Sequence, residues 1–174
     1  DVCSSDLQMK SIIHPLLDEE NAIANTIDIS NHILLTGSNA SGKSTFMKAV
    51  ALNLILAQSI QTATAHSFIY QPGYVMTSMA NADDVLSGDS YFMSELKSIR
   101  RLFNTHQCNK IYCFIDEIFK GTNTTERIAA SESVLSYLDN QKAYQVIAAT
   151  HDVELSTLLE NTYNNYHFNE SIQE

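Results

Sequence analysis

The sequence predicts an α/β fold in which a largely parallel sheet is flanked by helices. Segments of strand character alternate with segments of helical period along the chain. Residues 111–115 and 146–150 are apolar runs, which are typical of strands covered on both faces in a parallel sheet. A third apolar run, residues 33–35, is followed by a glycine-containing loop and a helical segment, an order that is typical of α/β proteins.

This glycine loop, residues 37–44, is an instance of the pattern GxxxxGK[S/T]. In such a loop, backbone N–H groups wrap phosphates and the helix start adds a partial positive charge. Lys43 is expected to reach the outer phosphates, and Ser44 is expected to ligate Mg²⁺. We therefore predict a P-loop nucleotide site whose cradle consists of Gly37, Ser38, Asn39, Ala40, Ser41, Gly42, Lys43, Ser44 and Thr45.

Four features are predicted in the first half of the chain from its periodicity and turn residues. Residues 1–30 predict a loop or short helix that leads into a strand, and residues 32–37 predict the strand before the glycine loop. Residues 43–58 predict a helix, because Phe46, Val50, Leu54 and Ala57 recur at helical spacing and so form a face that packs on the sheet. Residues 61–80 predict two short strands separated by a turn at residues 71–73.

The second half of the chain continues the alternation of helices and strands. A helix is expected over residues 91–105, with Ser90 as its N-cap and with Phe92, Leu96, Ile99, Leu102 and Phe103 along one side. The expected order after it is a strand over 111–115, a loop over 121–123, a helix over 125–138, a strand over 145–150, a helix over 152–159 and a strand over 166–168.

Composition limits the class of protein. A chain of 174 residues is most simply one domain. The net charge of −10 and the scattered basic residues argue against a domain that grips nucleic acid by itself. The longest apolar stretch, residues 49–57, is far too short for a membrane span, so no membrane partner is expected. The three cysteines are odd in number and lack CxxC spacing, which favours a reducing, cytoplasmic setting.

Polar residues follow the other two apolar runs. Asp116 and Glu117 come directly after residues 111–115, and acids at the carboxyl end of such a strand lie where open α/β sheets bind ligands. In a P-loop ATPase, such an aspartate holds Mg²⁺ and a neighbouring glutamate orients the attacking water. His151 follows residues 146–150, where a ring N–H can stabilise a γ-phosphate.

Five blocks together resemble the C-terminal ATPase domain of the MutS family of DNA mismatch repair proteins. These blocks are His14-Pro15-Leu16, residues 36–47, residues 83–95, residues 116–124 and residues 149–155. They occur in order and with the family's spacing, from about His14 to Leu158. The resemblance therefore implies a P-loop NTPase of the ABC-ATPase type.

The resemblance also implies roles for individual residues. Each nucleotide, ATP or ADP, would be sandwiched between one subunit's glycine loop and the Ser90 region of a second MutS-like subunit, most simply in a homodimer. Asp116 and Ser44 would support Mg²⁺, Glu117 would be the general base, and His151 would be the switch histidine. Asn39 would join the phosphate cradle, and residues 121–124 would lie near the dimer interface. Lys120 and Arg127 have two open interpretations, as phosphate contacts across the interface or as surface ion-pair partners.

The sequence departs from the family pattern in the glycine loop, and these departures bear on which DNA the whole protein recognises. Ser38, Ala40 and Ser41 stand where mismatch-correcting members have Pro, Met and Gly, which resembles branches that lack the mismatch-reading domain. We expect the chain to be a fragment of a longer protein, with one domain whose core spans about 14–168. DNA would be held by regions outside it.

Three functions remain open from the sequence. The first is an Mg-dependent ATPase that acts in DNA repair and controls the DNA-binding regions. The second is a nucleotide-gated dimerisation module with little turnover. The third, a transporter-type ABC subunit, is disfavoured because no Leu-Ser-Gly-Gly-Gln signature is present.

Overall fold

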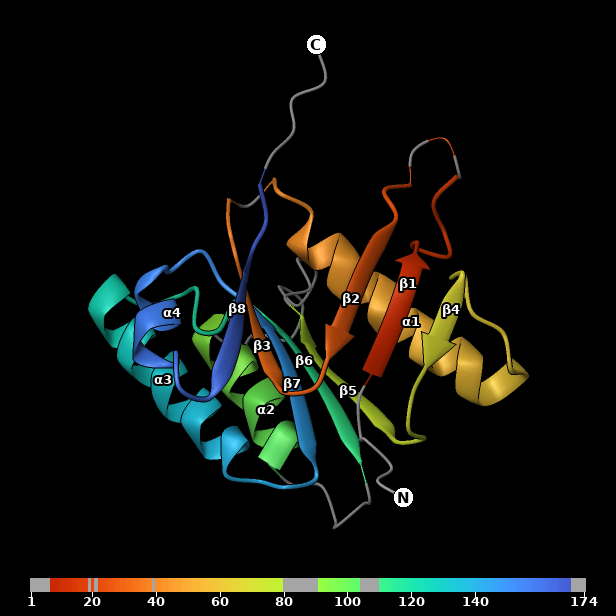
Figure 1. Cartoon of the computed structure of the whole chain (residues 1–174). Coiled ribbons are helices and arrows are strands. Elements are labelled where there is room, and N and C mark those ends of the chain that lie inside the picture. Colours follow the sequence, from red (N-terminus) through yellow and green to blue (C-terminus); the bar gives the residue numbers. More distant parts are fainter. Residues whose placement is uncertain are drawn as a thin grey trace.

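The computed structural model describes residues 7–18, 20, 22–38, 40–79, 91–103 and 110–169, and it contains two sheets. Its strands are β1 (Leu7–Ile12), β2 (Asn25–Ile29), β3 (His32–Thr36), β4 (Ser67–Ile69), β5 (Tyr74–Met79), β6 (Ile111–Asp116), β7 (Tyr144–Ala149) and β8 (Tyr163–His167). Its helices are α1 (Lys43–Ile60), α2 (Tyr91–Phe103), α3 (Thr124–Asp139) and α4 (Glu154–Leu158). Figure 1 shows their arrangement.

The larger sheet has the order β5-β6-β7-β3-β8, and every neighbouring pair of its strands is parallel. The smaller sheet has the order β2-β1-β4 and is antiparallel. The expected α/β fold with a parallel sheet flanked by helices is therefore confirmed. The antiparallel sheet is an addition that the sequence did not indicate.

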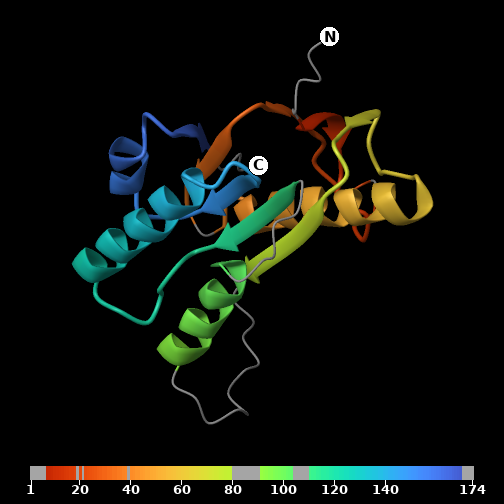
Figure 2. The same cartoon turned by 90° about the horizontal axis from the view of Figure 1, so that it is seen from below.

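Helix α1 lies between the two sheets. One hydrophobic cluster joins Leu7 and Ile29 of the smaller sheet, Met47 and Leu54 of α1, and Phe114 of the larger sheet. A second cluster, on the other face of the larger sheet, contains residues of α2, α3 and α4. Figure 2 shows α1 on one side of the larger sheet and α2 and α3 on the other. The three central strands β6, β7 and β3 thus bury both faces, whereas β8 at the edge is mostly exposed.

The environment of α1 explains its composition. Phe46, Val50, Leu54 and Ala57 are buried as expected, and Met47, Ala51 and Asn53 are buried as well because a second sheet covers the helix. The Asn53 amide donates hydrogen bonds to Ala49 O and Ile13 O, and its oxygen accepts one from the Thr64 N–H. A buried polar side chain is tolerated when its hydrogen bonds are made, and these bonds tie α1 to the segments around the smaller sheet.

Three sequence predictions differ from the structure. Strand β1 was expected to be loop or helix; its alternation is broken by a register shift between Met9 and Ile12, where Ser11 has a φ of 51°. The side chains of Leu96 and Phe103, expected to be on the packed side of α2, are 36% and 37% exposed, whereas Ile99 and Leu102 are buried. The helix expected over 152–159 is only Glu154–Leu158.

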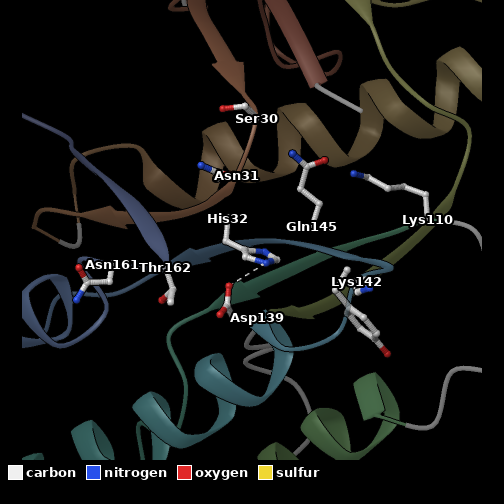
Figure 3. Close-up of a pocket in the computed structure, with 10 residues that line it drawn as sticks. Ser30, Asn31, His32, Lys110, Asp139, Lys142, Gln145, Asn161 and Thr162 are labelled. Atoms are coloured by element: carbon white, nitrogen blue, oxygen red, sulfur yellow. Dashed lines mark ion pairs between the residues drawn. The ribbon is translucent and has the colours of Figure 1, made fainter. Parts of the chain in front are cut away.

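At the amino ends of the parallel strands, a polar cavity of about 380 Å³ contains His32 and Asp139. His32 Nδ1 accepts the Val146 N–H at 2.9 Å, and His32 Nε2 lies 3.4 Å from Asp139 Oδ1. Figure 3 shows the two side chains facing each other across the cavity. Burial lowers the pKa of His32, Lys110 lowers it further, and Asp139 only partly opposes the shift. The neutral ring is therefore the form that the fold uses.

We expect this histidine to make the fold weaker as the pH falls. Because the pKa of His32 is lower in the folded chain than in the unfolded chain, the unfolded chain binds the proton first as the pH drops below about 6.5. The free energy of unfolding should decrease between pH 7.5 and 5.5, with a slope from this group of at most about 1.4 kcal/mol per pH unit. Urea unfolding at several pH values measures it.

The matched comparison for this prediction is between two substitutions to glutamine. His32→Gln should remove part of the pH dependence in this window, whereas His66→Gln, at an exposed histidine, should keep it. If the free energy of unfolding depends on pH equally in the parent chain and in His32→Gln, His32 is not the source of the pH dependence.

Candidate functional site

The glycine loop connects the carboxyl end of β3 to the start of α1. Gly37 has a φ of 136° and Gly42 has a φ of 89°, a region that favours glycine. A Cβ atom on Gly37 would also lie 2.5 Å from Phe168 O. Both glycines are therefore required by the shape of the loop. Asn39, predicted to join the cradle, lies outside the described residues.

Lys43 is held within the loop. Its side chain is buried, and Nζ donates hydrogen bonds to Gly37 O at 2.7 Å and to Ser38 O. The Ser41 hydroxyl donates to the same Ser38 O at 2.8 Å. The ammonium group thus binds backbone carbonyl oxygens of the loop that the sequence assigned to phosphates.

The start of α1 suits an anion. Its N-cap is Gly42, which offers no side-chain cap, and no acidic residue lies in the first turn. The first N–H groups of a helix have no partner within the helix and carry partial positive charge, so an uncapped start favours a bound anion. Ser44 is half-buried and Thr45 is exposed at this start. Phosphate binding at these residues stays a prediction.

Three adjacent strands bring the other candidate residues to the same edge of the sheet. In the register of β6, β7 and β3, Asp116 pairs with Ala149, which also pairs with Leu35. Beyond the strands, the Glu117 N–H donates to Ala149 O and the Thr150 N–H donates to Leu35 O, each at 2.9 Å. The glycine loop, Asp116-Glu117 and His151 therefore all follow the carboxyl ends of neighbouring strands, where α/β proteins bind ligands.

Glu117 lies between two cationic or protonatable groups. Its Oε2 is 2.7 Å from Lys120 Nζ, and its Oε1 is 3.3 Å from His151 Nδ1. Burial by itself raises the pKa of Glu117, but hydrogen bonds and charge from Lys120 and His151 outweigh burial and lower the pKa below its usual value. The side chain is 10% exposed. Glu117 is thus an ionised carboxylate with both oxygens engaged.

Arg127 and Asp152 form a second ion pair beside this group. The guanidinium donates two hydrogen bonds to the carboxylate, at 2.7 Å and 2.6 Å, and the Asp152 side chain is 6% exposed. These hydrogen bonds lower the pKa of Asp152 against the effect of burial. The pair joins α3 to the segment that carries His151. Of the two interpretations of Lys120 and Arg127, the structure shows the ion pairs.

The loop between β6 and α3 is capped by its own residues. The Asn123 side chain accepts the Glu126 N–H at 2.9 Å, and the Thr122 hydroxyl donates to the Glu126 carboxylate at 2.7 Å. Such caps fix a helix start. Ser90, the residue predicted to act from a second subunit, lies outside the described residues.

A mostly apolar cavity of about 380 Å³ adjoins the glycine loop. Its lining includes Ile12, His14, Leu17, Ile23, Phe46 and Phe168. Sequence reasoning did not identify this cavity, because its residues come from three distant segments that only the fold brings together. A hydrophobic cavity beside polar groups is a common form of small-molecule site.

The described part of the chain has neither a three-residue metal-binding cluster nor a membrane-spanning helix. No group of three or more His, Cys, Asp or Glu side chains there is arranged to hold a metal ion. No helix there is long and apolar enough to cross a membrane.

Comparisons with known proteins assign the family. Residues 33–174 match the family model MutS domain V. The chain is 36% identical over 151 residues to DNA mismatch repair protein MutS of Fusobacterium nucleatum. This alignment covers 84% of the chain and 17% of that relative. It is 38% identical over 158 residues to MutS protein homolog 4 of Homo sapiens, covering 86% of the chain and 16% of that relative. The chain thus spans less than a fifth of these relatives, and it belongs to the MutS family.

Proposed function

We propose that this chain is the ATPase domain of a MutS-family protein, a P-loop domain of the ABC-ATPase type that binds and hydrolyses Mg-ATP. The observation that carries the proposal is the convergence of the glycine loop, Asp116-Glu117 and His151 at the carboxyl ends of β3, β6 and β7. The match to a MutS family model supports it. Control of DNA-binding regions outside the chain, and a role in mismatch repair, are part of the same proposal.

The nucleotide would bind along the glycine loop. The loop N–H groups and the uncapped start of α1 would hold the phosphates. Lys43 would exchange its hydrogen bonds to Gly37 O and Ser38 O for bonds to phosphate oxygens. The apolar cavity lined by Phe46 and Phe168 would take the base.

The polar groups at the strand ends would supply the chemistry. Ser44 and Asp116 would hold Mg²⁺, which neutralises charge on the phosphate oxygens when it is bound. Glu117, already ionised by its neighbours, would accept a proton from the attacking water. His151 lies within 3.3 Å of Glu117 and would donate a ring N–H to the γ-phosphate.

One half of the site would come from a second subunit. In this proposal, Ser90, which precedes Tyr91 in the sequence, would approach the nucleotide of the partner. The nucleotide state would then control the geometry of the dimer, because ATP would bind the closed dimer better than the separate subunits.

The molar mass of Glu117→Gln in solution, measured by light scattering with and without Mg-ATP, tests this proposal. ATP is expected to convert monomer to dimer, and Ser90→Ala in the same background should abolish the shift while nucleotide binding persists. A chain that binds no nucleotide would contradict the proposal. A chain that dimerises with ATP but has no turnover when Glu117 is intact would favour the nucleotide-gated module.

A further inference from the structure

Lys120 contacts two different carboxylates, each through a different part of the residue. Its ammonium Nζ lies 2.7 Å from Glu117 Oε2, and its backbone N–H donates to Glu95 Oε1 at 3.1 Å. Glu117 follows β6, whereas Glu95 lies on α2. Between Glu117 and Lys120, the backbone has positive φ values at Glu117 (53°) and Phe119 (59°), and the Phe119 side chain is buried. The flexible part of the connection is the Lys120 side chain.

The Glu95 carboxylate is only half satisfied. Its Oε2 is fully buried and has no hydrogen-bond partner among the described residues. Burial raises the pKa of Glu95, and backbone hydrogen bonds from Lys120 and Gly121 together with the charge of Lys120 only partly oppose this shift. A buried acceptor without a donor costs free energy. Glu95 thus interacts with both the backbone and the charge of Lys120, which makes its Oε2 a candidate second partner for the ammonium group.

In contrast to Glu95, Glu117 has a partner on each of its carboxylate oxygens. Lys120 binds one of its oxygens and His151 contacts the other. A general base must accept a proton from a water molecule within hydrogen-bond distance, and the lone pair of Oε2 that faces Lys120 is not open to water while the ammonium group holds it.

We propose that Lys120 is a positioning residue that moves between two carboxylates, from Glu117 in the nucleotide-free chain to Glu95 when Mg-nucleotide is bound. The inference rests on the proposed function. The cause of the movement is electrostatic. A positive charge held at Asp116 would be next to Glu117 and would compete with the Lys120 ammonium group for the Glu117 carboxylate. The vacant oxygen of Glu95 gives the ammonium a second position, and Glu117 gains a free oxygen for water.

Equilibrium binding of Mg-ATP tests the switch without depending on turnover. Glu95→Gln keeps an oxygen that can accept the Lys120 N–H but removes the negative charge, so Mg-ATP should bind about fivefold more weakly. Lys120→Met removes the ion pair with Glu117 that nucleotide must break, so Mg-ATP should bind about threefold more tightly. Titration calorimetry measures both constants, and circular dichroism confirms folding.

The double variant gives the decisive result. In Lys120→Met, no ammonium group needs the second position, so adding Glu95→Gln should change Mg-ATP affinity by less than about 1.5-fold. Lys120→Arg keeps a cation and should keep the sensitivity to Glu95→Gln. Lys142→Met, at an exposed lysine at the other end of the sheet, is the matched control and should bind like the parent.

The outcomes separate the switch from the proposed function. If the parent chain binds Mg-ATP but Glu95→Gln binds it equally well, the switch is wrong and the ATPase proposal stands. A fivefold loss that persists in the Lys120→Met background also overturns the switch, because the effect would not pass through Lys120. If the parent chain binds no Mg-ATP, the proposed function fails, and the switch fails with it.

Discussion

Replacing Glu117 by Gln is expected to slow Mg-ATP hydrolysis by about 10²- to 10⁴-fold, the usual contribution of a general base. The amide keeps the size of the side chain but cannot accept the proton of the attacking water. Nucleotide affinity should rise by no more than about threefold, because the phosphate-binding groups of the glycine loop and α1 are unchanged and only the ion pair with Lys120 is weakened. Phosphate release under saturating Mg-ATP measures the first effect, and titration calorimetry measures the second.

Glu160→Gln is the control for this prediction, since Glu160 is exposed and follows α4. It removes the same charge from the chain and should hydrolyse Mg-ATP at the parent rate. Hydrolysis by Glu117→Gln at the parent rate would show that another group activates the water.

The second large effect is expected from Lys43→Met, which should weaken Mg-ATP binding by about 10- to 100-fold. A hydrogen bond to a charged group contributes about 1.5–3 kcal/mol, and about 1.4 kcal/mol corresponds to a tenfold change in affinity. The Lys43 side chain is buried with its ammonium in the glycine loop, so a methionine can keep the packing of the stem while it removes the charge. A fluorescent ATP analogue measures the affinity.

Lys48→Met provides the comparison, because Lys48 lies on the same helix but is exposed. Its affinity for the analogue should equal that of the parent chain, and both variants should retain the helical circular dichroism signal. Equal affinities for Lys43→Met and the parent would mean that the glycine loop does not hold the phosphates through this lysine.

Patterns that depend on neighbouring residues were predictable from the sequence. The apolar runs that became β6 and β7 are buried on both faces, so their composition alone indicated a parallel sheet. The glycine loop was equally predictable from the sequence, because its two glycines stand at fixed positions. Their φ values of 136° and 89° show why glycine is required there. The start of α1 at Lys43 follows from that loop.

Features that depend on distant residues were not predictable. Strand β1 was missed because its register shift breaks the alternation of buried and exposed side chains. The contact between Glu117 and Lys120 requires left-handed φ values at two residues that are not glycine, for which the sequence gives no signal. The bond between Lys120 and Glu95 joins residues 25 positions apart through tertiary packing.

The position of α1 between two sheets limits where this molecule can deform. A helix that packs on one side only can tilt or slide on its support, but α1 would have to break apolar contacts with both sheets to do so. A shift of α1 relative to the larger sheet would therefore be costly, so the candidate phosphate site at the start of α1 keeps its position relative to that sheet. The smaller sheet carries none of the candidate chemical groups, yet its apolar contacts help to hold the start of this helix in place.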